Sequence, residues 1–139
     1  MNRKEIIILA VGVLAILAVS MQLNERAKKK SDWYKAIAQA AESLHRTCPV
    51  LLDAETRQDA VEAKTDRRVV FHRTLIHADV RDIDVASFKD RLRPGLVNHV
   101  RTHPEMQVFR DHRVAVVYVY QDKAAQEAFR VVVIPKDDR

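Results

Sequence analysis

Apolar residues are distributed unevenly along the 139-residue chain, with one uncharged run over residues 6–23. The run lies between Glu5 and Glu25, and the nineteen positions between these glutamates would extend about 29 Å as a helix. This length is close to the hydrocarbon thickness of a bilayer. We therefore predict a transmembrane signal-anchor over residues 1–24. Its main lipid-facing side chains are expected to be Ile6, Ile7, Ile8, Leu9, Val13, Leu14, Ile16 and Leu17.

Two later segments have apolar residues at helical spacing. The first has Ser31 as its expected N-cap and ends before Pro49. Neither Gly nor Pro lies between Gly12 and Pro49, so we expect the membrane helix to continue directly into it. The second helical segment starts at a cap formed by Asp82 or Asp84. Its apolar residues keep their helical spacing across Pro94 and so form one continuous stripe. This continuity favours one kinked helix, although a break at Pro94 stays open. The two stripes are Trp33, Ile37, Ala41 and Leu44, and then Val85, Phe88, Leu92, Leu96 and Val100.

Five short runs are typical of β-strands because they are rich in β-branched and aromatic residues or alternate in polarity. They cover residues 58–64, 68–78, 106–110, 113–121 and 128–135. The first two form a hairpin around residues 65–67, and the last three form an antiparallel meander. The final run is so apolar that we expect a central strand, or one covered on both faces. Residues 36–139 are therefore predicted to form a small α+β domain with one sheet packed by helices.

The apolar run also fits a cleavable secretory signal, with a basic start at Arg3 and Lys4. Small residues at Ala18 and Ser20 would allow cleavage after Ser20. Retention is favoured because apolar residues continue to Leu23 and lysines follow. Both alternatives use the same export machinery.

The side of the membrane that holds the domain is harder to predict. By the positive-inside rule, the flank of a membrane helix that has more Lys and Arg stays in the cytoplasm. The C-terminal flank of the run has more of them, which would place the domain in the cytoplasm. The N-terminal position of the run and its basic-then-apolar order are typical of bacterial signal anchors. We predict a single-pass protein of the bacterial inner membrane with its globular domain in the periplasm.

The formal net charge of +5 is concentrated next to the anchor. Residues 25–35 carry +3, whereas residues 36–139 carry only +1. This basic juxtamembrane segment is better explained by anionic lipid headgroups than by a nucleic acid. We expect a headgroup collar formed by Arg26, Lys28, Lys29 and Lys30, and no nucleic-acid partner.

No group of residues forms a recognisable catalytic or metal motif. His99 and His103 are four apart, but no glutamate lies between them and Pro104 follows, so a solvated helix end is the preferred interpretation. Cys48 follows His45 by three positions, and a small buried apolar side chain is its expected role. Two acidic patches are best explained by helix capping and solvation. They are Asp53, Glu55 and Asp59, and then Asp79, Asp82 and Asp84. We predict that the chain is not an enzyme and that it binds neither a cofactor nor a metal ion.

Tyr118 and Tyr120 alternate along one predicted strand, so both side chains project from the same face. They could pack under a helix, or they could line an exposed surface that binds a partner. Packing under a helix is the favoured alternative in a domain of this size. We nevertheless name Tyr118 and Tyr120 as the candidate interaction surface.

Residues 48–134 resemble a loosely defined group of uncharacterised bacterial export-routed domains. The shared features are a proline-led Asp-x-x-Thr segment, a Phe/Leu-striped helix, a Tyr-x-Tyr strand and a final apolar strand. The chain lacks the cysteine pair of that group's second half. The resemblance implies the fold and an envelope location, and it brings no activity. It rests on Pro49, Asp53, Thr56, Phe88, Leu92, Tyr118, Tyr120 and Phe129.

These features predict a non-enzymatic, membrane-anchored protein-interaction domain of the bacterial envelope. Its expected partners are membrane lipid, through the N-terminal helix, and another envelope protein. One alternative is a periplasmic domain that binds a small apolar ligand or lipid between its helices and its sheet. Another is a cytoplasmic regulator tethered to the membrane. The sequence predicts no oligomeric state.

Overall fold

The computed structural model describes residues 2–135, apart from the side chains of Lys29, Lys30 and Ser31. It divides into two compact units, Met1–Trp33 and Tyr34–Arg139. The first unit consists of most of helix α1 (Arg3–His45), which contains an 18-residue window of mean hydropathy 2.7. By length and composition this helix could cross a membrane, and none of the window is buried.

Helix α1 is a single element, so the expected continuation of the apolar segment into the following amphipathic segment is confirmed. Ser31 therefore does not cap a separate helix, and its side chain lies outside the described set. Within the second unit, Ile37 and Ala41 of the predicted stripe are buried.

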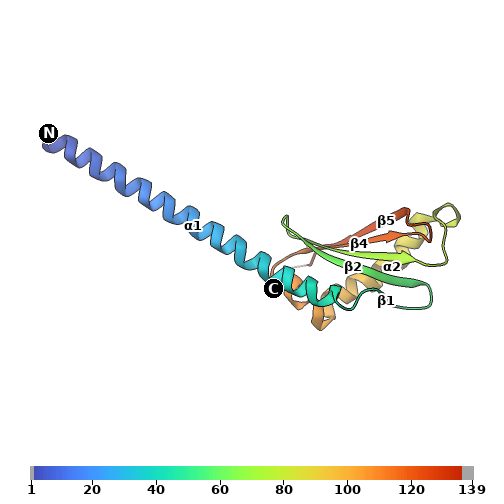
Figure 1. Ribbon diagram of the computed structural model, residues 1–139. Helices are drawn as coiled ribbons and strands as arrows, with labels where there is room; N and C mark the ends of the chain where they lie inside the picture. Colours follow the sequence, from blue (N-terminus) through green and yellow to red (C-terminus); the bar gives the residue numbers. More distant parts are fainter. Residues whose placement is uncertain (1, 136–139) are drawn as a thin grey trace. The chain divides into compact units, whose positions relative to one another are not determined.

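The second unit contains one five-stranded mixed sheet (Figure 1). Its order is β1-β2-β3-β4-β5, in which β3 and β4 are parallel and all other neighbours are antiparallel. The strands are β1 (Val50–Leu51), β2 (Thr56–Lys64), β3 (Arg68–Leu75), β4 (Ala115–Gln121) and β5 (Glu127–Val133). The α+β class and the β2–β3 hairpin were predicted correctly.

The helical connection between β3 and β4 explains why these two strands are parallel. Parallel neighbours need a long crossover, and α2 (Val85–Thr102) supplies it. Asp84 caps α2, because its carboxylate accepts a hydrogen bond from the Ser87 N–H. Pro94 lies inside the helix, so the alternative of two separate helices is wrong. Short helical turns flank α2: η1 (Val80–Asp82), η2 (Pro104–Met106) and α3 (Gln107–Asp111).

The predicted strand over residues 106–110 is wrong, since these residues are helical. Pro104 occupies the start of η2, where its fixed φ favours a helical turn and its missing N–H costs nothing. Met106 and Phe109 are three positions apart and both fully buried, as one side of a helical turn requires. The predicted three-stranded antiparallel meander is therefore a two-stranded hairpin, β4–β5, beside the parallel strand β3.

The core lies between one face of this sheet and the helices. Cross-strand neighbours Phe71, Tyr118 and Val131 are all buried, and they share this face. Leu96 and Val100 are the buried side chains of α2, which runs alongside the strands in Figure 1. The prediction that the last strand is central or doubly covered is wrong. β5 is an edge strand, and Val132 on its other face is 43% exposed.

Candidate protein-binding groove

The predicted interaction surface at Tyr118 and Tyr120 is wrong, because both side chains are buried. The alternative of packing under a helix is confirmed for Tyr118, whose hydroxyl lies 3.2 Å from Nδ1 of His99 on α2. The ring of Tyr120 stacks on Phe129 with centroids 4.8 Å apart, and the ring of Tyr118 lies against Phe71 at 5.2 Å. Aromatic side chains thus occupy the space in which the lipid-binding alternative would require a deep cavity.

A buried arginine lies among these aromatic rings. Arg73 is 8% exposed, and its guanidinium donates to the Tyr120 hydroxyl at 3.0 Å and to Oε1 of Gln58 at 3.2 Å. The same guanidinium lies 4.6 Å from the centroid of the Tyr118 ring, within cation–π distance. Burial raises the pKa of the Tyr118 hydroxyl well above its usual range, so this side chain stays neutral. The tyrosines therefore organise the core.

A groove of about 510 Å³ lies along the outer edge of β5. Helix α2 contributes Arg93, Val97 and Arg101 to its lining, and the end of the sheet contributes residues 132–134. The arginines follow from helical spacing, because positions 93, 97 and 101 are four apart and project from one side of α2. Ile134 is 71% exposed at the end of this groove. The groove therefore combines exposed aliphatic surface with two cationic side chains.

The two arginines of the groove are available for a ligand. Within the described part of the chain, neither Arg93 nor Arg101 lies within ion-pair distance of a carboxylate. The Arg93 guanidinium makes one long hydrogen bond, 3.4 Å, to the carbonyl oxygen of Val132. An acidic side chain brought to the groove would meet an exposed guanidinium that is not already neutralised.

Sequence reasoning missed this groove because it placed the last strand in the middle of the sheet. The available signal was the i, i+4, i+8 series of residues 93, 97 and 101, which lies beside the apolar stripe of α2. The alternation of β5 was a second signal. Val131 and Val133 are buried, whereas Val132 and Ile134 are exposed, which is the pattern of a strand with one covered face.

His99 and His103, which were expected at a solvated helix end, lie together at the end of α2, where His103 is exposed and His99 is partly buried. The rings of His99 and His103 are 4.7 Å apart, and Glu105 joins them from η2. Burial is the main reason that the pKa of His99 is lowered, and the hydrogen bond to Glu105 acts in the opposite direction. The imidazole of His99 is therefore neutral at neutral pH.

The other candidate residues have structural roles. Nδ1 of His45 accepts a hydrogen bond from the Val61 N–H at 3.3 Å, and the Cys48 thiol is 3.6 Å from the Leu44 carbonyl oxygen. Asp53 closes a turn by accepting from the N–H groups of Glu55 and Thr56. Asp79 pairs with Arg81, whose guanidinium holds the pKa of that carboxyl far below its usual range.

Sequence comparison assigns the chain to a family. The model of a domain of unknown function, DUF8479, matches residues 33–129, which is more than half of the chain. The chain belongs to this family. The match begins near the end of α1 and includes the whole sheet as far as Phe129 in β5. No curated protein matches the DUF8479 chain in sequence.

Solved structures share the fold of this DUF8479 chain at low sequence identity. A candidate secreted protein of Pseudomonas aeruginosa has a TM-score of 0.64 at 12% identity, covering 76% of this chain and 92% of its own. The type II secretion system pilotin EpsS of Vibrio vulnificus has a TM-score of 0.60 at 8% identity, covering 78% and 94%. The type II secretion system pilotin AspS of Vibrio cholerae has a TM-score of 0.60 at 11% identity, covering 79% and 95%. These similarities establish the fold.

Proposed function

We propose that this DUF8479 chain is a non-enzymatic protein-interaction domain of the bacterial envelope. Its partner is another envelope protein, which presents an amphipathic segment carrying acidic side chains. The segment binds in the groove between α2 and β5, with aliphatic side chains against Val97 and Ile134 and carboxylates at Arg93 and Arg101. This proposal is carried by two exposed guanidinium groups that lie beside aliphatic surface and have no ion-pair partner among the described residues.

Charge complementarity favours an acidic segment over other occupants of the groove. A basic segment would bring like charges to Arg93 and Arg101, and like-charge juxtaposition at an interface is unfavourable. A purely apolar ligand would bring no carboxylate to either guanidinium group. The fold similarity to two secretion-system pilotins and to a candidate secreted protein supports an envelope role.

Helix α1 anchors the domain in this proposal. Its exposed side chains include Ile8, Leu14 and Ile16, which are 66–71% exposed and suit a lipid environment. The collar of Arg26, Lys28, Lys29 and Lys30 meets anionic headgroups. The side chains of Lys29 and Lys30 lie outside the described residues, and those of Arg26 and Lys28 are exposed. The chain is a single-pass protein of the inner membrane with its domain in the periplasm.

A peptide-binding assay with the full chain in detergent micelles tests the proposal. The probe is an amphipathic peptide in which pairs of Leu alternate with pairs of Glu. The control peptide has Lys in place of every Glu. We expect the acidic peptide to bind and the basic control to bind more weakly. Arg101→Glu, which balances Arg93 with a carboxylate, should abolish this preference, and Arg93→Glu together with Arg101→Glu should reverse it. Lys123→Glu is the matched control, because Lys123 is exposed in the loop before β5, at the opposite end of that strand.

Other occupants of the groove would give different results in the same experiments. If light scattering showed a dimer that Arg101→Glu dissociates, the groove would hold a second copy of the chain. Equal binding of the acidic and basic peptides, or equal effects of Arg101→Glu and Lys123→Glu, would contradict the proposal.

A further inference from the structure

Three side chains with metal-binding atoms converge where α2 ends. They are His99 on α2, His103 at its C-cap and Glu105 in η2. One ligand atom from each side chain lies within 4.8 Å of the other two. His99 is partly buried, whereas His103 and Glu105 are exposed. The site is therefore open to solvent on one side.

Two of the three distances within this histidine–glutamate cluster fit a tetrahedral metal ion, and all three ligand atoms lie within 4.8 Å of one another. Bond lengths of about 2.0–2.2 Å to Zn²⁺ place two tetrahedral ligand atoms roughly 3.3 Å apart. Oε1 of Glu105 lies 3.3 Å from Nε2 of His99 and 3.5 Å from Nδ1 of His103. A bound cation would replace these carboxylate–imidazole contacts and would bring the two imidazole nitrogens to roughly 3.3 Å from each other.

The surrounding structure orients two of the ligands. Nδ1 of His99 lies 3.2 Å from the Tyr118 hydroxyl, which leaves Nε2 directed toward Glu105. Because the Tyr118 hydroxyl can accept as well as donate, it can take the Nδ1–H of the tautomer whose Nε2 is free to bind a metal. Arg110 fixes the turn, because its guanidinium donates to the carbonyl oxygens of Val100 at 2.8 Å and His103 at 2.9 Å.

We propose that His99 Nε2, His103 Nδ1 and the Glu105 carboxylate form a binding site for a divalent cation of the Zn²⁺ type. Two imidazoles and one carboxylate are a ligand set that Zn²⁺ and neighbouring transition metals accept. The open side leaves the fourth coordination position for water or for an external ligand. This site is separate from the groove, and the proposal does not depend on the proposed function.

Titration of the tag-free, chelator-treated full chain in detergent micelles tests the site. Zn²⁺ binding is measured by calorimetry, and Co²⁺ replaces Zn²⁺ to give a visible absorption spectrum. We expect one ion per chain and tetrahedral Co²⁺ absorption. Tyr118→Phe, which removes only the hydroxyl that contacts His99, should weaken binding about 10- to 100-fold. His103→Ala and Glu105→Gln each remove a ligand and should weaken it at least as much.

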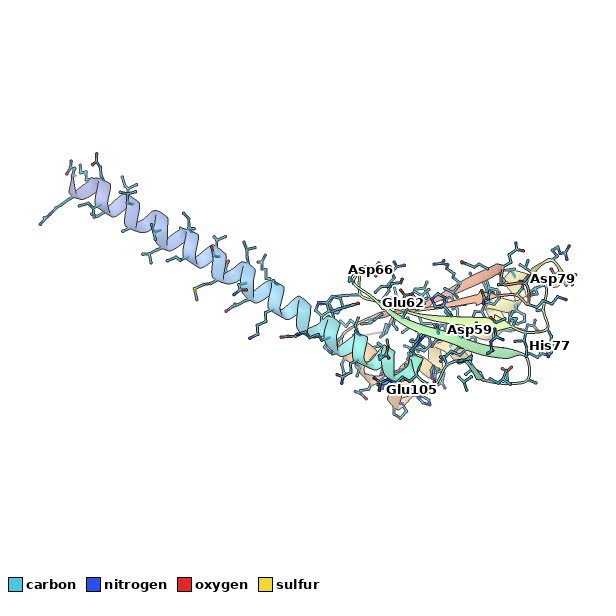
Figure 2. All side chains as sticks on the ribbon, in the orientation of Figure 1. Asp59, Glu62, Asp66, His77, Asp79 and Glu105 are labelled. Atoms are coloured by element: carbon cyan, nitrogen blue, oxygen red, sulfur yellow. The ribbon has the colours of Figure 1, made fainter. Side chains whose placement is uncertain are left out.

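The chain offers a matched control in a second histidine–carboxylate pair. Nε2 of His72 lies 3.6 Å from Glu62, and the two side chains are about as exposed as His103 and Glu105. Figure 2 shows Glu62 on the sheet, well separated from Glu105. His72→Ala should leave Zn²⁺ affinity unchanged. Absence of binding, or an equal loss in His72→Ala and His103→Ala, would overturn the proposal. Because His103 and Glu105 are exposed, their variants decide the result even if Tyr118→Phe does not fold.

Discussion

The buried Arg73 provides a quantitative test of how the core is held together. Its guanidinium donates to Gln58 and Tyr120 and lies over the ring of Tyr118. Within the described residues no carboxylate forms an ion pair with it. Arg73→Met keeps most of the aliphatic volume and removes the charge. It leaves the Gln58 carbonyl and the Tyr120 hydroxyl without this donor.

The size of the destabilisation can be worked out from the polar groups that lose their partner in Arg73→Met. Each buried polar group that loses its partner costs about 1–3 kcal/mol, and loss of a desolvated cation–π contact costs about 1–2 kcal/mol. Removing a buried charge recovers part of this, because a charge is costly to desolvate. We expect Arg73→Met to lower the free energy of unfolding by about 2–4 kcal/mol. In a triple variant with Gln58→Leu and Tyr120→Phe, most of this loss should be recovered, because no polar group remains unpaired.

Urea unfolding of the full chain in detergent, followed by near-ultraviolet circular dichroism, measures the effect. This signal reports the packing of the tyrosines, and it excludes the helical signal of the anchor. Arg57→Met is the control, because Arg57 lies on the neighbouring strand with a partly exposed side chain. If Arg73→Met were no more destabilising than Arg57→Met, the reasoning about the buried network would be refuted. The same conclusion would follow if the triple variant were less stable than the single one.

Three further predictions concern acid stability, the anchor and orientation. Backbone hydrogen bonds from Val80, Gln126 and Ala124 hold the pKa of the buried Asp122 carboxyl below its usual value of 3.8. The stabilisation is present above that value and is lost as pH falls through the lower folded pKa, so the urea midpoint should fall as the pH is lowered below 3.8. The urea midpoint should fall less on acidification in Asp122→Asn. Identical pH profiles of the two proteins would count against a stabilising role of the Asp122 carboxylate. Leu14→Arg places a charge in the proposed anchor, at a cost of about 2.5–3.5 kcal/mol at a helix centre, and should reduce the membrane-bound fraction. Leu51→Arg, at an exposed position of β1, should not. A reporter fused after Arg139 should show activity if it is of a kind that works only in the periplasm. Activity of a reporter that works only in the cytoplasm would instead favour the membrane-tethered regulator.

Elements with strong local patterns could be predicted from the sequence. The stripe that ends at Val100 and the cap at Asp84 specify α2, and β-branched residues around a polar turn specify the β2–β3 hairpin. The continuity of α1 follows from the absence of Gly and Pro between Gly12 and Pro49. Each of these signals depends on residues that are close together in the chain.

Features that depend on long-range pairing could not be predicted in the same way. The edge position of β5 depends on β3 pairing with β4 in parallel, which no local pattern specifies. Helix α3 has five residues, too few for its periodicity to be distinguished from that of a strand, although Pro104 marked the start of a helical turn. Glu105 is six positions after His99, so only the turn at η2 brings it to the histidine pair.

In the proposed function, the groove between α2 and β5 holds an acidic segment of another envelope protein. Photo-crosslinking in cells tests it most directly, with a photoreactive amino acid at position 97 in the groove and, as control, at the adjacent exposed position 98. We predict one discrete crosslinked partner from position 97, which is lost when Arg93→Glu and Arg101→Glu are added and retained with Lys123→Glu. Equal crosslinking from both positions, or a product unaffected by the two charge reversals, would contradict the claim.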